Sequence, residues 1–433
     1  MKRFLLSVFL VSIGVSVFAA GQFQSKPDHP YFVKFNPVKA PRPTGLLLKK
    51  GDRLAICGDS ITEQKMYSRI LETYLTVCAP ELEVTVRQYG WSGERAPGFL
   101  ARVTNDCLRF KPTIATTCYG MNDHEYRPYE ERIGQTYREK SIEIVESFKA
   151  NGARVIQGSP GCVGKMPGWV KSASGTVEDL NLNLCNLRNI GIEIAEQEKV
   201  GFADVFWPML TAGFEARKQY GEDYAMAGKD GVHPGWAGHL IMATAFLKGL
   251  GLEGEIGAFT VDLGRGKATV SMGHELVAFK DGQLEIRSRR YPFCATGELN
   301  SDGSIRSGMS LVAFNAELNR LMLVIKNAPA KNYKIAWGNE TKSYSAEQLS
   351  KGVNLADDFS ANPFSESFAK VDAAVAAKQA YETRQIKDLI HGPEGKADMD
   401  KTVVLTEEVR APLARAVAEA FVPVIHTIRI EAE

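Results

Sequence analysis

Neither sign of charge is in excess in this chain, which carries 52 Lys and Arg against 51 Asp and Glu in 433 residues. Balanced charge supplies no surplus of cations to neutralise a phosphate backbone, so nucleic acid is not an expected partner. The sequence also contains no Cys-x-x-Cys pair. That absence removes the ligand spacing of a structural zinc site or a redox motif, and no metal or cofactor is expected.

Cysteine is sparse, and the seven that occur form an odd set that leaves at least one thiol free. Several lie in apolar runs, as Cys57 does, where a free cysteine acts as a small buried hydrophobe. A disulfide between some pair, Cys162 and Cys185 for example, stays open because pairing cannot be read from sequence.

The apolar run near the N-terminus, residues 4–18, is short for a bilayer core. It follows Lys2 and Arg3 and ends before Ala19 and Ala20, which is the layout of a cleaved secretory signal. A single membrane span is the alternative. We expect a signal peptide over residues 1–19, an N-terminal extension over 20–50, a secreted or periplasmic protein, and no stable membrane insertion after cleavage.

Between residues 51 and 252, short apolar runs alternate with longer amphipathic ones. This alternation predicts an α/β fold, a flavodoxin-like three-layer α/β/α sandwich around a parallel five-stranded sheet. The strands are expected at 53–57, 83–89, 113–118, 154–157 and 201–204. The helices are expected at 67–75, 99–110, 130–150, 177–199 and 235–250.

After Gly251 the pattern changes to strand-like alternation broken by Gly, Asn and Asp, which predicts a β-rich accessory region over 253–357, interpreted as an antiparallel unit. Residues 358–433 are expected to be helical, with helices at 368–390 and 409–421 and a polar connector at 392–401. No recognisable Ser, His and acid arrangement occurs there, so we interpret the region as supporting or flanking the preceding domain.

Ser60 stands in Gly58-Asp59-Ser60-Ile61-Thr62, directly after the first strand and before a helix. In an open α/β sheet the crevice at the carboxyl ends of the strands binds ligands, so a serine there can expose its Oγ. Helix capping is the alternative role. His233 lies just ahead of the last helix, three residues after Asp230. A serine nucleophile needs such a base, and the base needs a partner that fixes its tautomer.

Gly93 follows the second strand and Asn122 the third, on the same rim as Ser60. The backbone N–H of Gly93, the side-chain amide of Asn122 and the backbone N–H of Ser60 are candidate donors to the oxyanion that forms when a carbonyl is attacked. Ordinary turn formation is the alternative for both residues.

These four stretches resemble, in order and placement, the four sequence blocks of the SGNH (GDSL-type) hydrolases, over about residues 54–250. The resemblance implies that Ser60 attacks, that His233 with Asp230 is the base, and that Ser60, Gly93 and Asn122 form the oxyanion hole. The first block reads Ser60-Ile61-Thr62 where the family has Ser-Leu, a variant similar to that of many carbohydrate-esterase-like members. A Gly-x-Ser-x-Gly elbow, typical of α/β-hydrolases, is absent.

Four residues within or beside the blocks are candidate substrate contacts: Trp91, Tyr119, His124 and Arg127. Packing is as good an explanation for the two aromatic side chains. The loop over residues 158–174, which includes Trp169, could frame the cleft.

The expected activity is hydrolysis of small esters, O-acetyl groups on carbohydrates in particular, because export suits polymeric substrates. A lipid or aryl esterase is the alternative within the family. A carbohydrate-binding protein that has lost turnover is the alternative from another class. The sugar, the bond position and the oligomeric state are not encoded in any pattern we recognise.

Overall fold

Five short strands form a parallel sheet in the order β2-β1-β3-β4-β5, the flavodoxin-like order, in a computed structural model that describes residues 22–433. The expected signal peptide lies outside the described residues. The strands are β1 (Arg53–Gly58), β2 (Thr85–Gln88), β3 (Ile114–Cys118), β4 (Arg154–Gly158) and β5 (Gly201–Ala203). Strand β3 is buried along its whole length, which explains its unbroken run of small and apolar residues.

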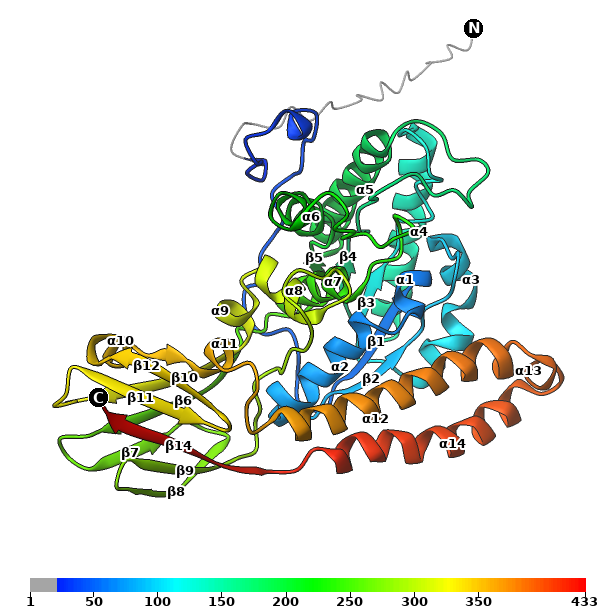
Figure 1. Cartoon of the computed structure of the whole chain (residues 1–433). Helices are drawn as coiled ribbons and strands as arrows, with labels where there is room; N and C mark the ends of the chain where they lie inside the picture. The colour runs from blue at the N-terminus through cyan, green and yellow to red at the C-terminus, as the bar shows by residue number, and fades with distance from the viewer. Residues whose placement is uncertain (1–21) are drawn as a thin grey trace, which may run out of the picture.

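Helices cover both faces of this sheet, as Figure 1 shows, so the expected three-layer α/β/α fold is confirmed. Helices α2 and α7 pack on the face that carries Ile56 and Ile156, and α3 and α4 pack on the face that carries Ala55 and Val155. The helices are α1 (Ser60–Glu63), α2 (Tyr67–Cys78), α3 (Ala96–Asp106), α4 (Glu131–Ala150), α5 (Val177–Glu198), α6 (Phe206–Tyr220) and α7 (Trp236–Gly249). Among residues 22–433, no helix has both the length and the apolar character that crossing a membrane requires.

The chain then builds two further sheets, seen at the lower left of Figure 1. One has the order β13-β10-β6-β7 and the other the order β12-β11-β14-β9-β8. The strands are β6 (Glu255–Asp262), β7 (Lys267–Val270), β8 (His274–Lys280), β9 (Gln283–Ser288), β10 (Arg320–Lys326), β11 (Asn332–Trp337), β12 (Glu340–Ser345), β13 (Val353–Asn354) and β14 (Val424–Ala432). Alternate residues of β6, β9, β10 and β11 are buried, so the two sheets enclose a shared core.

Several short helices and one long hairpin complete the C-terminal region. The short ones are α8 (Ile305–Leu311), α9 (Phe314–Leu318), α10 (Ala346–Lys351) and α11 (Leu355–Asp358). The hairpin consists of α12 (Ser365–Arg384), a π-helical turn η5 (Gln385–Ile390), α13 (Pro393–Ala397) and α14 (Met399–Ala420).

Three sequence expectations need correction. The β-rich region is not purely antiparallel, because β6 and β10 pair in parallel across the long connection between them. The polar connector at 392–401 contains α13 and the start of α14. The last residues are not helical, because β14 pairs antiparallel with both β9 and β11. The pairings of β6 with β10 and of β14 with β9 and β11 join segments far apart in sequence, which local periodicity cannot report. Helix α6 was also not predicted.

The cysteines settle the open question of disulfides, because all seven are buried and free in the structure. Burial raises the pKa of Cys162 and Cys185 to about 12, so both thiols stay protonated near neutral pH.

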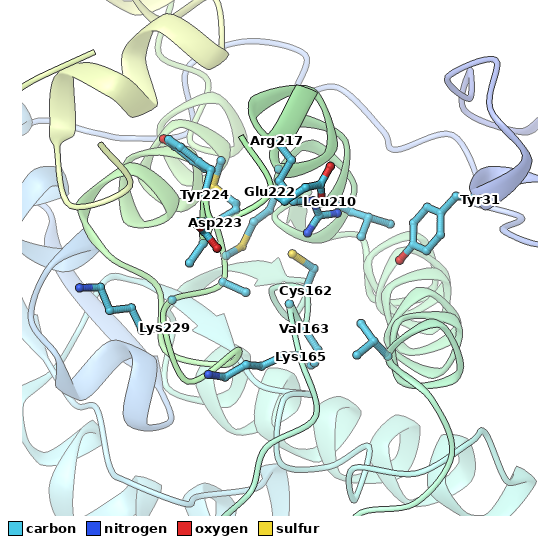
Figure 2. A pocket seen from close by; sticks show the side chains of 18 residues that line it. Tyr31, Cys162, Val163, Lys165, Leu210, Arg217, Glu222, Asp223, Tyr224 and Lys229 are labelled. Carbon is cyan, nitrogen blue, oxygen red and sulfur yellow. The ribbon is translucent and has the colours of Figure 1, made fainter. Parts of the chain in front are cut away.

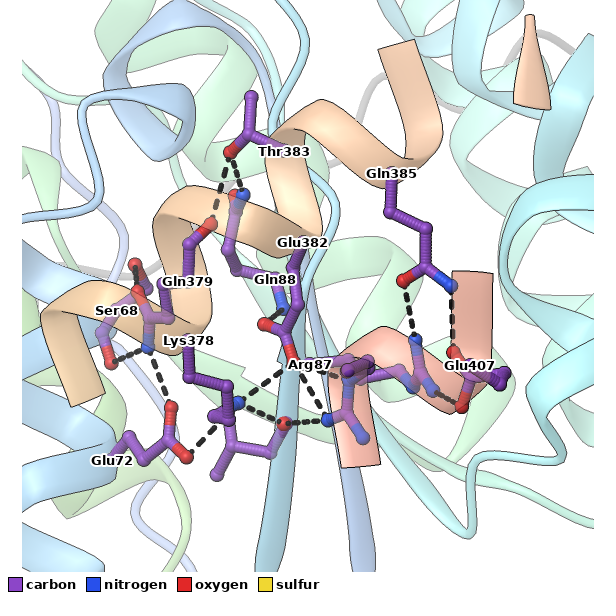
Figure 3. Close-up of polar contacts among 12 residues, drawn as sticks. Ser68, Glu72, Arg87, Gln88, Lys378, Gln379, Glu382, Thr383, Gln385 and Glu407 are labelled. Carbon is purple, nitrogen blue, oxygen red and sulfur yellow. Dashed lines mark hydrogen bonds and ion pairs between the residues drawn. The ribbon is translucent and has the colours of Figure 1, made fainter. Parts of the chain in front are cut away.

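The hairpin lies along β2, the edge strand of the parallel sheet (Figure 3). Lys378 Nζ donates to the carbonyl oxygen of Val86 at 2.7 Å, and Arg410 of α14 donates to the same oxygen at 3.1 Å. The N–H of Gln88 donates to Glu382 at 3.3 Å. An uncovered edge strand is a template for pairing with another chain, so these contacts close a vulnerable side of the sheet.

Lys378 is the centre of this contact and is enclosed by two carboxylates. Its Nζ lies 2.8 Å from Glu382 Oε1 and 3.1 Å from Glu72 Oε1, and its side chain is 2% exposed. Gln379 donates to Glu72 at 2.8 Å, and Ser68 of α2 donates to Gln379 at 2.7 Å. The buried charges are therefore paired across the contact between α12 and α2 (Figure 3).

A second buried network of hydrogen bonds lies between the two β-sheets, and its donors and acceptors can be assigned in only one way. Trp337 Nε1 donates to His426 Nδ1 at 3.1 Å, because an indole nitrogen cannot accept. His426 Nε2 therefore donates to Ser288 Oγ at 2.9 Å, and Ser288 donates to His274 Nδ1 at 2.7 Å. His274 Nε2 donates to the carbonyl oxygen of Ile256 at 3.1 Å. Both imidazoles must be neutral for every bond to form.

We expect Lys378→Met to lower the free energy of unfolding by about 3–5 kcal/mol, because it leaves the buried Glu72 carboxylate without its cation, while Glu382 keeps only Arg410. Chemical denaturation measures the change. The matched control is Lys370→Met, which breaks the exposed Lys370–Glu366 pair on the same helix and should change the free energy of unfolding much less. Equal effects of the two substitutions would contradict a structural role for the buried cluster.

Acid should destabilise the two-sheet region. Burial lowers the pKa of His426 to about 3, whereas an unfolded histidine takes up its proton near 6.5. The unfolded chain therefore binds more protons between these values, and the free energy of unfolding falls as pH falls through that window. His426→Gln, which keeps one donor and one acceptor, should have a shallower slope over the same range. Identical slopes for the two proteins would exclude His426 as a cause.

Candidate active site

Ser60 begins the one-turn helix α1 immediately after β1, at the carboxyl edge of the parallel sheet. Asp59 caps this helix, since its Oδ1 accepts a hydrogen bond from the N–H of Ile61 at 2.9 Å. Burial raises the pKa of the Asp59 carboxyl to about 7. Ser60 Oγ lies 2.8 Å from His233 Nε2. The fold thus brings a serine hydroxyl within hydrogen-bond reach of an imidazole from a residue 173 positions later.

His233 is held by Asp230 through both its ring and its backbone. Its Nδ1 lies 2.7 Å from Asp230 Oδ2, while Asp230 Oδ1 accepts the backbone N–H groups of His233 and Val232, each at 2.9 Å. Partial burial alone would raise the pKa of Asp230, but these hydrogen bonds hold it below its usual value. The carboxylate stays charged and fixes the imidazole with Nδ1 as donor and Nε2 facing the serine.

Gly93 and Asn122 follow β2 and β3 at the same edge of the sheet. Gly93 has a φ of +73° and would meet no atom within 4 Å on gaining a Cβ, so it stands on an open turn. The Asn122 amide is fixed from two sides, because Nδ2 donates to the carbonyl oxygen of Glu94 at 3.0 Å and Oδ1 accepts from Tyr126 at 3.0 Å. One amide hydrogen of Asn122 stays available to a ligand.

Beneath this turn lies an ion pair that sequence analysis did not single out. Arg102 donates to both oxygens of Glu94, at 2.6 and 2.7 Å, and to the carbonyl oxygen of Tyr89 at 2.7 Å. Both side chains are buried. Burial opposes the charge of Arg102, but the Glu94 carboxylate outweighs it and raises the pKa of the guanidinium. The pair ties the residue that follows Gly93 to helix α3.

Two of the four residues predicted to contact substrate have buried side chains. Tyr119 is 2% exposed, and its hydroxyl donates to Glu94 Oε2 at 2.9 Å. His124 is fully buried, and its Nδ1 donates to the carbonyl oxygen of Met121. Burial lowers the pKa of His124 to about 4, so the ring is neutral. Both side chains pack under the site and support its loops.

The other two candidates are half-buried. Trp91 has the Arg102 guanidinium over its ring, 5.0 Å from the centroid, and the ring of His391 against it in an edge arrangement at 5.0 Å. Arg127 makes ion pairs at 3.5 Å with Glu125 and Glu130. Both side chains therefore already contact other residues of the protein, which leaves less of their surface free for a substrate.

Trp169 is the aromatic side chain that the structure places beside the base. Its ring centroid lies 5.8 Å from that of His233, and the residue is 49% exposed. Sequence analysis named it only as part of the loop after the fourth strand. The signal was present, since a large apolar residue in a Gly- and Pro-rich loop at the carboxyl edge of the sheet has no strand or helix to pack into.

A cavity of about 610 Å³ is lined in part by residues 222–229, the segment that precedes Asp230 in the sequence (Figure 2). Its lining includes Cys162, Arg217, Tyr224, Gly228 and Lys229, but neither Ser60 nor His233. Within residues 22–433, no group of three His, Cys, Asp or Glu side chains is arranged to hold a metal ion.

Comparison with known proteins agrees with this geometry. Residues 56–241 match the model of the GDSL-like lipase/acylhydrolase family. An acetylxylan esterase of Geobacillus stearothermophilus is 26% identical over 225 residues, which are 47% of this chain and 95% of that protein. The solved structure of a gut microbial diltiazem-metabolizing enzyme covers 91% of this chain and 100% of its own, with 19% identity and a TM-score of 0.70, so the two share their fold. Residues 56–241 therefore form a domain of the GDSL-like lipase/acylhydrolase kind, and the chain is a carboxylic ester hydrolase.

Proposed function

We propose that this esterase is secreted and removes small acyl groups, O-acetyl groups in particular, from carbohydrates by Ser60–His233–Asp230 catalysis. The observation that carries the proposal is the continuous hydrogen-bonded line from Ser60 Oγ through both ring nitrogens of His233 to Asp230. It stands at the carboxyl edge of the parallel sheet, where ligands of such folds bind.

The reaction follows from the direction of this line. His233 Nε2 accepts the hydroxyl proton while Ser60 Oγ forms a bond to the acyl carbon. The protonated ring then gives that proton to the departing alcohol oxygen, which leaves an acyl group on Ser60. Water repeats the sequence, with Nε2 as base, and releases the acid and the free serine. Asp230 stabilises the protonated ring throughout.

Negative charge on the carbonyl oxygen needs donors that are already in place. The backbone N–H groups of Ser60 and Gly93 and the remaining amide hydrogen of Asn122 are the proposed donors. The hydrogen bonds of Asn122 to Glu94 and Tyr126 support this role, because they fix the amide before substrate arrives and so lower the cost of reorganisation.

Two observations favour an acylated sugar as substrate. The acetylxylan esterase relative matches over nearly its whole length. The exposed ring of Trp169 beside His233 offers a flat apolar surface of the kind that packs on a sugar ring. Secretion is proposed from the sequence of residues 1–20 alone, with its basic start, short apolar run and small residues.

Ser60→Ala and His233→Ala should each lower kcat by roughly three to six orders of magnitude, and the double variant should be little worse, because nucleophile and base act as one unit. Acetate release from acetylated polysaccharides, beside p-nitrophenyl esters of increasing chain length, measures the effect. Preference for long acyl chains would favour a lipid esterase instead. Sugar binding without turnover in the parent protein would indicate an inactive carbohydrate-binding protein.

Asn122→Ala should lower kcat by about a hundred- to a thousandfold with a smaller change in KM, because its amide is needed mainly when the oxyanion forms. Steady-state kinetics on p-nitrophenyl acetate separate the two constants. A change confined to KM would make Asn122 a substrate-binding residue and remove it from the proposed oxyanion hole.

A further inference from the structure

The turn that carries Gly93 is contacted by a part of the chain nearly 300 residues later. We call residues 90–94, which run from Gly90 to Glu94, the oxyanion loop. The tip of the C-terminal hairpin, η5 and the residue after it, lies against this loop at Trp91. The π-helical turn η5 continues α12 at its C-terminal end; π-helical turns are rare and are frequent at functional sites, which makes the position of this one informative.

Glu63 is the link between the hairpin and the loop. Its Oε2 accepts hydrogen bonds from the Ser92 N–H at 2.5 Å and the Ser92 hydroxyl at 2.7 Å, while its Oε1 accepts one from Lys387 Nζ at 2.7 Å. Glu63 is the last residue of α1, the same helix that Ser60 begins. One carboxylate therefore joins the helix of the nucleophile, the neighbour of Gly93 and the hairpin.

The loop and α1 are in close backbone contact at this point. A Cβ on Gly90 would lie 2.2 Å from the backbone nitrogen of Glu63, so only glycine fits there. Lys65 also approaches Glu63, but its Nζ donates to the carbonyl oxygen and not to the carboxylate. Lys387 is therefore the cation that holds the orientation of the Glu63 carboxylate toward Ser92.

The hairpin also clamps the residue before Ser92. Lys387 Nζ lies 5.3 Å from the centre of the Trp91 ring, and the His391 ring packs edge-on against it. His391 Nε2 in turn lies 2.8 and 2.7 Å from the two carboxylate oxygens of Asp106 at the end of α3. The oxyanion loop is thus held through the side chains of Trp91 and Ser92, which limits how far the neighbouring Gly93 can shift.

We propose that Lys387 is a positioning residue for ester hydrolysis, acting through Glu63 and Ser92 to hold the Gly93 N–H toward the oxyanion. The inference rests on the proposed Ser60 mechanism. It gives the C-terminal hairpin a role in turnover. The hairpin does not touch the substrate but holds the loop that stabilises the transition state.

Lys387→Met keeps much of the apolar stem that packs on Trp91 and removes the cation. We expect kcat on p-nitrophenyl acetate to fall by about 10- to 100-fold, with KM within about twofold, because a misplaced donor weakens the transition state more than the ground state. Phenylboronic acid, whose boron becomes tetrahedral on Ser60 Oγ, should bind more weakly by a similar factor. Lys387→Arg should restore most of the rate.

Glu63→Gln removes the same link from its other end, and the Lys387→Met, Glu63→Gln double variant should be no slower than the worse single variant. Lys370→Met, in an exposed ion pair on α12, is the matched control and should keep the parental kcat. Parental kcat in Lys387→Met, or in Glu63→Gln if the first variant does not fold, overturns the inference.

Ser60→Ala on the same substrate separates this inference from the proposed function. Loss of turnover in Ser60→Ala with parental kcat in Lys387→Met removes only the positioning role. Retained turnover in well-folded Ser60→Ala removes the proposed mechanism itself, and the positioning role with it.

Discussion

A buried lysine between two glutamates fixes the C-terminal hairpin on the parallel sheet and on α2. Lys378 pairs with Glu382 on its own helix and with Glu72 on α2, and it also binds the edge of the parallel sheet at Val86. Buried charges tolerate little displacement, because each loses far more on losing its partner than an exposed charge does. The orientation of the hairpin relative to α2 and β2 is therefore fixed, and its tip contacts the oxyanion loop.

Two serine–histidine arrangements in this chain differ in what their hydrogen bonds leave free. Ser60 and His233 form a line that is anchored at Asp230 and has Ser60 at its free end, as the proposed mechanism requires. The line through Ser288 is closed at both ends, by an indole that only donates and a carbonyl that only accepts. It is also buried, so the same residue types there stabilise a core.

The sequence was informative wherever the chemistry is local. Ser60, Gly93 and Asn122 each follow a strand, and parallel strands end at one edge, so their placement at the same edge of the sheet could be predicted from order alone. Burial on a loop could not be predicted, because Tyr119 and His124 stand beside the motifs yet face inward, where Tyr119 donates to Glu94 and His124 donates to the carbonyl oxygen of Met121. Contacts such as Lys387 with Glu63, 324 residues apart, leave no periodic trace in sequence.

The place of β14 has a consequence for how the chain matures. This strand ends at the second-last residue, yet it lies in the middle of its sheet, between β9 and β11. Neither neighbour has its full set of backbone partners until Val424–Ala432 has been synthesised and has paired. The hairpin is connected at one end to this strand, so its docking depends on the formation of β14. Proteolytic loss of β14 would remove an inner strand, expose the edges of β9 and β11, and loosen the hairpin that contacts the distant oxyanion loop.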